Sequence, residues 1–305
     1  MSVKIAFIMV CHKAPDHINN LIKRLLEFED ADVFLHIDRN NSGIRKSIIE
    51  NSRVKILPEN ESFFVKWGSV EIVKATLKLI ACVKRTKKDY DYIWLLSGQD
   101  YPICSAAEAE KRLALNPGMN YIDVILPGEN RYDFYNKRCE IPYPSWINKN
   151  NIVVKSIKKL YMIVTGGYYH TFSFLKRKKP FDAGFAYGSQ WWTLSAEAAY
   201  DILQYTRKHL EVLKYYRKCI IPDESYFQTV FMSGPYKNKR MPSLTFVNWG
   251  KNRRSPEVLT AADIDTLKEK SDTFVFARKF QMPESGEIIK ELSTIGVEKE
   301  GKNDT

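Results

Sequence analysis

The sequence predicts an α/β fold in which a mostly parallel central sheet carries helices on both faces. Over roughly the first hundred residues, short apolar runs alternate with segments of helical periodicity, a pattern typical of parallel strands joined by crossover helices. The chain of 305 residues is 44% hydrophobic and 13% aromatic, so it can bury a full core. A disordered chain and a small disulfide-stapled scaffold are therefore excluded.

The individual elements follow from local patterns. The apolar run 4–10 predicts a buried strand, and the apolar spacing over 18–26 predicts a helix after it. The rest of the first half is predicted to form strands at 32–38, 54–57 and 92–96 and a helix at 70–83. The second half is less regular, with a helix predicted from 196 to about 214 and another beginning at Pro222.

Polar side chains stand at the ends of three predicted strands. His12 follows the first strand, Asp38 ends the second, and residues 97–100 follow the strand at 92–96. Ligands of such sheets bind outside the carboxyl ends of the strands, so these residues predict a nucleotide-sized site at one edge. The chain has neither the G-x-G-x-x-G fingerprint nor the phosphate-loop motif, which argues against a dehydrogenase and a P-loop enzyme.

The charge balance favours an anionic partner. The chain has 47 Lys and Arg against 36 Asp and Glu, a formal charge of +11, which suits a phosphorylated small molecule or an anionic membrane. Nucleic-acid binding is not expected, because no zinc-finger, RNP or helix-turn-helix signature is present. No apolar run approaches the roughly 20 residues that cross a bilayer, and we expect a cytoplasmic protein.

The segment 149–179 leaves two interpretations open. It combines an amphipathic stretch around Ile157 and Leu160 with the basic run KRKK at 176–179. The first interpretation is a solvated helix followed by a charged loop. The second is peripheral docking at the inner face of an anionic membrane.

The sequence predicts no metal site. The five cysteines form no C-x-x-C pair and do not cluster with histidine. Three Asp-x-Asp pairs occur, but those at 30–32 and 89–91 precede strands and that at 263–265 reads as a helix start. A divalent ion bound at the strand ends needs such a pair after a core strand, where only Asp100 stands, and one carboxylate holds a cation poorly.

Four segments, in the same order, resemble the core 2/I branching β-1,6-N-acetylglucosaminyltransferases and peptide O-xylosyltransferases of glycosyltransferase family 14. They are LSGQDYPI at 96–103, GSQWWTLS at 188–195, PDESYF at 222–227 and FARKF at 276–280. The resemblance runs over nearly the whole chain. It implies a GT-A type fold, a UDP-sugar donor, and inversion at the anomeric carbon without a cofactor or metal.

The resemblance also implies roles for particular residues. Glu224 matches the catalytic base. The donor-binding residues would be Asp38, Arg254 and Lys279, with Arg254 and Lys279 taking the diphosphate. His12 and Asp100 are predicted to bind the donor because they stand at the same strand ends. The acceptor-binding residues would be Trp249, Arg131 and Arg138, with a glycan or a lipid-linked saccharide as acceptor.

Elementary chemistry agrees with these roles but leaves alternatives. Displacement at an anomeric carbon needs a group that takes the acceptor proton and charge that stabilises the departing diphosphate. Glu224 can do the first, although a capping acid at a helix start is its alternative interpretation, and Asp223 is the better predicted cap. Arg254 and Lys279 can supply the charge.

The predicted domain organisation is a single catalytic domain over 1–284, with a donor-binding part at about 1–125 and an acceptor and catalytic part at about 126–284. Residues 285–305 are predicted to be a polar, flexible tail. The donor sugar is predicted to be N-acetylglucosamine. A UDP-xylose-dependent enzyme of the same family and a non-catalytic basic protein that binds glycan or membrane remain alternatives.

Overall fold

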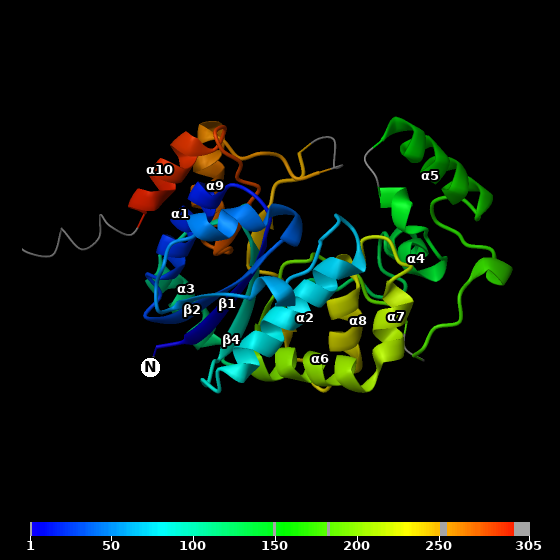
Figure 1. The fold of residues 1–305 in the computed structure, drawn as a ribbon, viewed down its shortest axis with the longest axis horizontal. Coiled ribbons are helices and arrows are strands. Elements are labelled where there is room, and N and C mark those ends of the chain that lie inside the picture. The colour runs from blue at the N-terminus through cyan, green and yellow to red at the C-terminus, as the bar shows by residue number, and fades with distance from the viewer. Residues whose placement is uncertain (1, 149–150, 182–183, 251–254, 296–305) are drawn as a thin grey trace, which may run out of the picture.

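The computed structural model describes residues 2–148, 151–181, 184–250 and 255–295, which form two sheets with helices around them (Figure 1). The strands are β1 Lys4–Cys11, β2 Asp30–Ile37, β3 Val54–Ile56, β4 Tyr92–Ser97, β5 Asp100–Pro102, β6 Asn120–Tyr121, β7 Thr193–Ser195, β8 Arg240–Met241, β9 Thr245–Val247 and β10 Phe276–Arg278. The α-helices are α1 Pro15–Leu25, α2 Val70–Arg85, α3 Ala106–Leu115, α4 Tyr132–Glu140, α5 Ile152–Val164, α6 Ala196–Lys208, α7 Leu210–Tyr216, α8 Tyr226–Ser233, α9 Ile264–Lys270 and α10 Gly286–Thr294. Single 3-10 segments are η1 Arg39–Ser47, η2 Glu59–Glu61, η3 Ser145–Asn148, η4 Ser173–Leu175, η5 Pro222–Glu224 and η6 Ala261–Asp263.

The larger sheet has the strand order β3-β2-β1-β4-β7-β6-β8. Its first four strands are parallel, and β7 is antiparallel to both of its neighbours. The sequence therefore predicted the existence and direction of β1 to β4 correctly. Because β2, β1 and β4 are adjacent and parallel, their carboxyl ends lie together at one edge.

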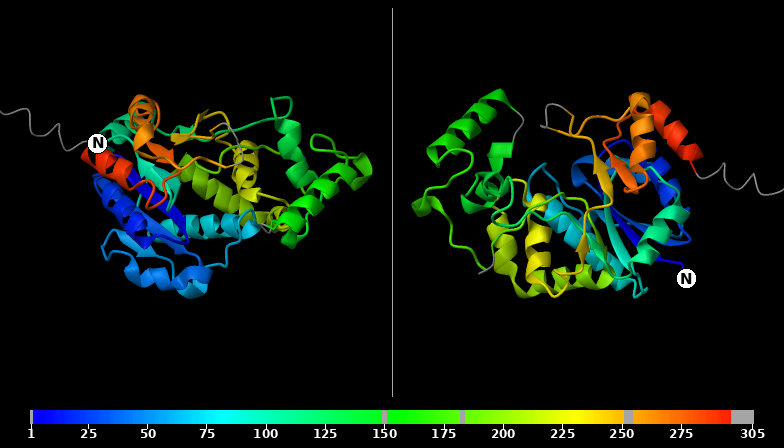
Figure 2. Two further views of the ribbon diagram at one scale, coloured as in Figure 1. Left: turned by 90° about the horizontal axis from the view of Figure 1, so that it is seen from above. Right: turned by 180° about the vertical axis from the view of Figure 1, so that it is seen from behind.

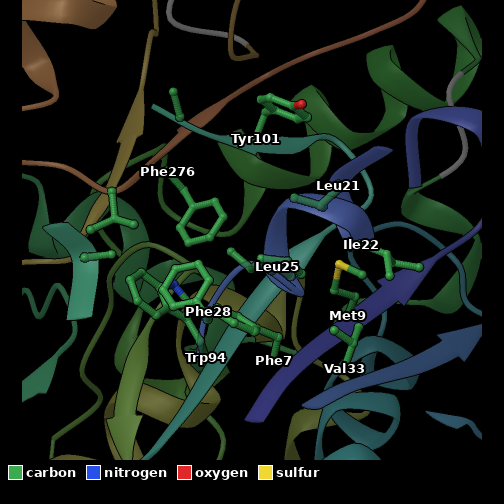
Figure 3. Close-up of a cluster of buried hydrophobic side chains, with 14 of the residues drawn as sticks. Phe7, Met9, Leu21, Ile22, Leu25, Phe28, Val33, Trp94, Tyr101 and Phe276 are labelled. Carbon is green, nitrogen blue, oxygen red and sulfur yellow. The ribbon is translucent and has the colours of Figure 1, made fainter. Parts of the chain in front are cut away.

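Helices cover both faces of this sheet, as predicted, because β1 is apolar on both sides. Phe7 and Met9 belong to the core under α1, α3, α9 and α10, whereas Ala6 and Ile8 belong to the core under α2, α6 and α8. In the first core the ring of Phe7 lies 5.0 Å from that of Phe28, and the ring of Trp94 lies 5.0 Å from that of Phe276 (Figure 3). The alternation of side chains along β1 thus places one hydrophobic core on each face of the sheet.

The smaller sheet joins distant parts of the chain. Its order is β5-β10-β9, with β10 antiparallel to β5 and parallel to β9. Arg278 of β10 is thereby paired with Asp100 of β5. This pairing brings the FARKF segment to the edge where β4 ends.

α4 and α5 lie at one end of the molecule, far from α10, in every view (Figures 1 and 2). Met162 of α5 packs in a small separate core with Ile141, Tyr143, Ile147 and Ile220, which come from the segment after α4 and the loop before η5. None of the helices within the described ranges is long and apolar enough to span a membrane.

Two expectations about helices are wrong. The helix predicted from 196 to about 214 is broken at His209, whose backbone leaves the helical region at φ −124° and ψ 61°. The flexible tail predicted from 285 instead begins as α10, which buries Ile288, Ile289 and Leu292 in the first core. Residues 296–305 of that predicted tail lie outside the described ranges.

Candidate functional site

The carboxyl edge of β1, β2 and β4 brings His12 and Asp38 together. Asp38 is buried, and its Oδ1 accepts hydrogen bonds from the Asn40 amide at 2.9 Å, from Asn40 Nδ2 at 3.0 Å and from the Val65 amide at 3.3 Å. The carboxylate therefore holds two loops at this edge. An acidic side chain fixed in this way has a defined orientation toward any ligand above the strand ends.

His12 lies within electrostatic reach of two other predicted donor residues. Burial is the main cause that lowers the pKa of His12; the charges of Lys13 and Lys279 lower the pKa further, and the charge of Asp38 raises it. Burial therefore favours the neutral form of the imidazole. His12, Asp38 and Lys279 form one group, although Lys279 is far from the other two in sequence.

A cluster of cations borders this group. Burial lowers the pKa of Lys279, and the neighbouring charges of Lys13 and Arg278 lower the pKa further. Lys13 also lines a cavity of about 120 Å³ together with Gln99 and Phe280. Close positive charges that repel one another suit a polyanion such as a diphosphate. The sequence analysis did not single out Lys13 or Arg278.

Asp100 lies underneath this cluster. Its side chain is fully buried, and its Oδ2 and Oδ1 accept hydrogen bonds from the Ser97 amide at 2.7 Å and from Ser97 Oγ at 3.1 Å. Burial raises the pKa of Asp100, and the charge of Arg278, 3.7 Å away, lowers it. The carboxylate contacts Ser97 and Arg278. We therefore assign Asp100 as a residue that positions these two side chains.

Arg278 connects the donor edge to the predicted catalytic base. Its guanidinium lies 3.9 Å from the centre of the Trp191 ring. Burial lowers the pKa of this arginine, and the charges of Asp100 and Glu224 raise it. Its Nε and Nη1 are buried and have no hydrogen-bond partner among the described residues. Nη1 lies 3.7 Å from Asp100 Oδ1, so the guanidinium faces the buried carboxylate.

Glu224 ends η5, in a backbone arrangement held from two sides. The amide of Ile221, a residue with φ 52°, donates to the Gly68 carbonyl at 3.1 Å, and the Gly188 amide donates to the Glu224 carbonyl at 3.0 Å. The carboxylate Oε2 lies 2.5 Å from Arg138 Nη1. The Arg138 guanidinium in turn lies 4.6 Å from the centre of the Tyr135 ring. Glu224 is thus an oriented, partly exposed carboxylate.

The neighbouring carboxyl group, that of Asp223, has a raised pKa. Burial and then the charge of Glu224 raise the pKa of Asp223 to about 7, and its Oδ1 is buried without a hydrogen-bond partner among the described residues. The cap position of η5 is Ile221, which offers no side-chain acceptor, so the expectation that Asp223 caps a helix is wrong.

The predicted acceptor residues border the same region. Trp249 is 45% exposed, and it follows Asn248, whose amide donates to the Arg278 carbonyl at 3.4 Å. Arg131 is exposed, and its guanidinium lies 5.4 Å from the Tyr135 ring centre, the ring that Arg138 also contacts. Arg254 lies outside the described residues.

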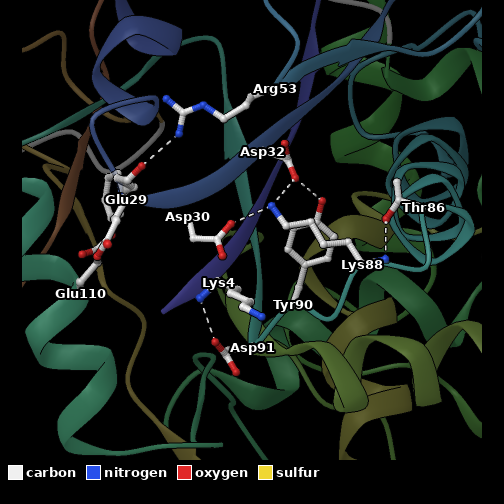
Figure 4. Close-up of polar contacts among 11 residues, drawn as sticks. Lys4, Glu29, Asp30, Asp32, Arg53, Thr86, Lys88, Tyr90, Asp91 and Glu110 are labelled. Atoms are coloured by element: carbon white, nitrogen blue, oxygen red, sulfur yellow. Dashed lines mark hydrogen bonds and ion pairs between the residues drawn. The ribbon is translucent and has the colours of Figure 1, made fainter. Parts of the chain in front are cut away.

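The Asp-x-Asp pairs lie elsewhere. Asp30 and Asp32 begin β2 at the opposite edge, where Lys88 Nζ lies 2.7 Å from Asp30 Oδ1 and 3.0 Å from Asp32 Oδ2 (Figure 4). Asp91 accepts from the Lys4 amide at 2.7 Å, and Asp263 closes a capping box with Thr260. Within the described ranges, no group of three or more His, Cys, Asp and Glu could hold a metal ion.

The site is therefore a parallel sheet edge with a cluster of cations, beside a carboxylate oriented by an arginine. In a comparison with protein families, the model of the Core-2/I-Branching enzyme family matches residues 5–269. The chain belongs to this family. The α/β architecture agrees with the GT-A type fold expected of it.

Individual relatives are distant. The chain is 21% identical over 315 residues to xylosyltransferase 2 of Rattus norvegicus, covering 95% of this chain and 33% of that protein. It is also 21% identical over 311 residues to a xylosyltransferase of Ciona intestinalis, covering 95% of this chain and 34% of that protein. The chain thus spans about a third of the length of these relatives. A solved structure of mouse xyloside xylosyltransferase 1 aligns over 90% of this chain and 97% of its own, with a TM-score of 0.37 and 11% identity.

Proposed function

We propose that the chain is an inverting, metal-independent glycosyltransferase that moves a sugar from a UDP-sugar to a hydroxyl of a glycan acceptor. Glu224 is the general base in this proposal. Lys279 and Arg254 neutralise the departing diphosphate, and His12 and Asp38 bind on the uridine side. Asp100 supports the donor site from below, through Ser97 and Arg278.

The observation that carries the proposal is the link made by Arg278. Its charge interacts with Asp100 at the donor edge and with Glu224 in η5, so the leaving-group side and the base lie in one electrostatic neighbourhood. A direct displacement needs both on opposite sides of the same anomeric carbon.

Of the two neighbouring acids, Asp223 and Glu224, we assign proton transfer to Glu224 because its side chain is the more exposed. About a quarter of its side chain is accessible, at 28%, and its orientation is fixed by Arg138. Asp223 is buried and holds a proton more tightly. Glu224 therefore accepts the proton of the acceptor hydroxyl as the new bond forms.

The positive charge comes from side chains. Lys13 and Arg278 lie close enough to Lys279 to lower its pKa, and the negative charge that develops on the diphosphate as its bond to the sugar breaks offsets the repulsion among these cations. Lysine acts as a point charge and arginine as a fork toward phosphate oxygens. Such a cluster can perform the task that a divalent ion has in other sugar-nucleotide enzymes.

The acceptor would lie along Trp249, Arg131 and Arg138. An exposed indole can pack on the C–H face of a sugar ring, and the two arginines border the carboxylate that must meet the hydroxyl. A glycan or a lipid-linked saccharide fits this surface.

Two donor sugars are compared. N-acetylglucosamine is the donor predicted from the sequence, whereas the names of the relatives, which are xylosyltransferases, favour xylose. Thermal shift with UDP-N-acetylglucosamine and UDP-xylose separates the two, because a ligand that binds the native state raises the melting temperature.

The experiment that tests the reaction is hydrolysis of both UDP-sugars in excess EDTA. We expect activity to persist, and we expect Glu224→Gln to lower kcat by about a hundredfold or more with nucleotide binding retained. Glu50→Gln, an exposed glutamate far from η5 in sequence, is the control. A strict requirement for Mn²⁺ or Mg²⁺ contradicts the charge argument. Absence of any hydrolysis or transfer by the unaltered protein favours a non-catalytic binding protein.

A further inference from the structure

α5 turns an apolar face to solvent. The exposed fractions of Ile152, Leu160 and Val164 are 81%, 61% and 64%. The full set of exposed apolar side chains on this helix is Ile152, Val153, Ile157, Leu160, Ile163 and Val164. At helical spacing these positions occupy one continuous arc of about 140°. Soluble surfaces seldom expose so large a contiguous apolar patch without a partner.

The orientation of this face is fixed, because the other side of α5 is attached to the protein. Met162 is buried, and the Tyr143 hydroxyl donates to its Sδ at 2.9 Å. The Tyr161 hydroxyl donates to the Pro142 carbonyl at 2.6 Å. A rotation that hid the apolar arc would break these contacts.

The segment after α5 adds further exposed apolar surface. Tyr169, Phe172 and Phe174 are 61%, 51% and 80% exposed. The rings of Phe172 and Phe174 stack on each other with centroids 5.6 Å apart. Aromatic side chains with such exposure are favoured at membrane interfaces.

Positive charge is concentrated in the same region. Residues 141–181 contain eight Lys and Arg and no Asp or Glu, whereas the other 264 residues contain 39 basic and 36 acidic side chains. The exposed Lys155 and Lys159 lie beside the apolar arc on α5 and make no ion pair within the described ranges. Most of the net charge of the chain therefore belongs to the part with the exposed apolar face.

We propose that this face docks onto the surface of an anionic lipid bilayer. The apolar side chains of α5 would enter the boundary between headgroups and acyl chains, while the lysines beside them contact anionic headgroups. A second copy of the chain is the less suitable occupant, because a two-fold interface would bring two strongly basic segments together.

Docking would also set the direction of the active site. Lys137 of α4 is buried, and its Nζ donates to the Thr165 carbonyl at 2.9 Å and to the His170 carbonyl, both just after α5. The next residue, Arg138, holds Glu224. Two consecutive residues of α4 thus connect the membrane-facing helix to the proposed base, which suits an acceptor presented at the bilayer.

Flotation of the full chain with vesicles tests this proposal. We expect the protein to float with phosphatidylcholine vesicles that contain phosphatidylglycerol and much less with phosphatidylcholine alone. The double variant Ile152→Asp with Leu160→Asp should lower the floated fraction at least about tenfold. Lys155→Glu with Lys159→Glu should lower it by a similar factor, as should high salt.

The matched control is Leu115→Asp with Leu210→Asp, two leucines 69% and 55% exposed on other helices; it should float like the wild type. Melting temperature and near-ultraviolet circular dichroism verify folding. Without vesicles, hydrolysis of UDP-sugar by the α5 variants should equal that of the wild type, so a failure of the reaction is told apart from a failure of docking. The proposal is overturned if the wild type does not float, if the α5 variants float equally well, or if the same variants instead abolish a dimer.

Discussion

Arg138 Nη1 and Glu224 Oε2 lie 2.5 Å apart, although the two residues are separated by 86 positions in the chain. Both side chains remain partly accessible, at 18% and 28%. The pair joins α4 to the η5 turn, and it orients the carboxylate that we assign as the base.

The first prediction concerns this pair. Arg138→Met should lower kcat about 10- to 100-fold, which corresponds to about 1.4 to 2.7 kcal/mol of lost transition-state stabilisation, because Glu224 loses the contact that orients it. KM for the UDP-sugar should change little, since the donor edge is intact. Arg138→Lys, which retains a charge, should recover part of the rate. Steady-state kinetics measure both, and an unchanged kcat in Arg138→Met would contradict the role of the pair.

The second prediction concerns Asp223 and pH. Its pKa rises from 3.8 to about 7 in the folded protein, so between these values the native state binds the proton that the unfolded chain releases. Stability must then fall as pH rises through this window. Asp223→Asn removes this penalty and should stabilise the protein at pH 8 by on the order of 2–4 kcal/mol, with little gain at pH 4.

Denaturant unfolding of both proteins at the two pH values measures this difference. An equal effect of Asp223→Asn at both would show that the gain, if any, comes from packing and that Asp223 is not protonated by burial.

The third prediction concerns the cation cluster. Lys279→Ala and Lys13→Ala should each weaken UDP binding about tenfold, because each removes about 1.4 kcal/mol of interaction with the diphosphate. Each variant should also reduce the salt dependence of binding. Lys23→Ala, an exposed lysine on α1, is the matched control. Calorimetric titration with UDP measures the affinity of each variant. Wild-type affinity in both variants would show that the diphosphate does not bind at this cluster.

The fourth prediction concerns Gly188, which has no room for a side chain. A Cβ at this position would lie 1.9 Å from the Asp123 carbonyl oxygen, and the Gly188 amide donates to the Glu224 carbonyl. Gly188→Ala should therefore destabilise the protein by about 2 kcal/mol or more and displace the η5 turn, with a loss of kcat. Gly43→Ala, where a Cβ would meet nothing within 4 Å, is the control. Thermal unfolding and steady-state kinetics measure these effects. A melting temperature and a kcat close to those of the wild type in Gly188→Ala would contradict the prediction.

The fold was predictable where local patterns are strong. The apolar runs of β1, β2 and β4 are strong signals of buried parallel strands, and the polar residues after them marked the sheet edge at which His12 and Asp38 lie together. α10 was missed because only Ile288, Ile289 and Leu292 carry its apolar side within a polar sequence. Its burial depends on α9 and α1, which no local pattern reveals.

The site was less predictable, because its residues meet through long-range pairing. Arg278 is a neighbour of Asp100 only because β10 pairs with β5, so its contact with Trp191 could not be inferred from spacing. Lys13 stands next to His12 in the sequence, but an exposed lysine carries no signal of its own. The roles of Glu224 and Lys279 came from the family resemblance, and the structure adds the contacts through which they can act.

The position of β10 between β5 and β9 has a consequence for synthesis in the cell. A nascent chain that has emerged from the ribosome up to residue 270 already contains β1, β4 and Asp100, but it lacks Arg278 and Lys279. If the proposed function holds, such a chain lacks two of the three clustered cations, so donor nucleotide can stabilise the fold fully only when translation is almost complete. Truncated products would consequently compete poorly for the cellular pool of sugar nucleotide.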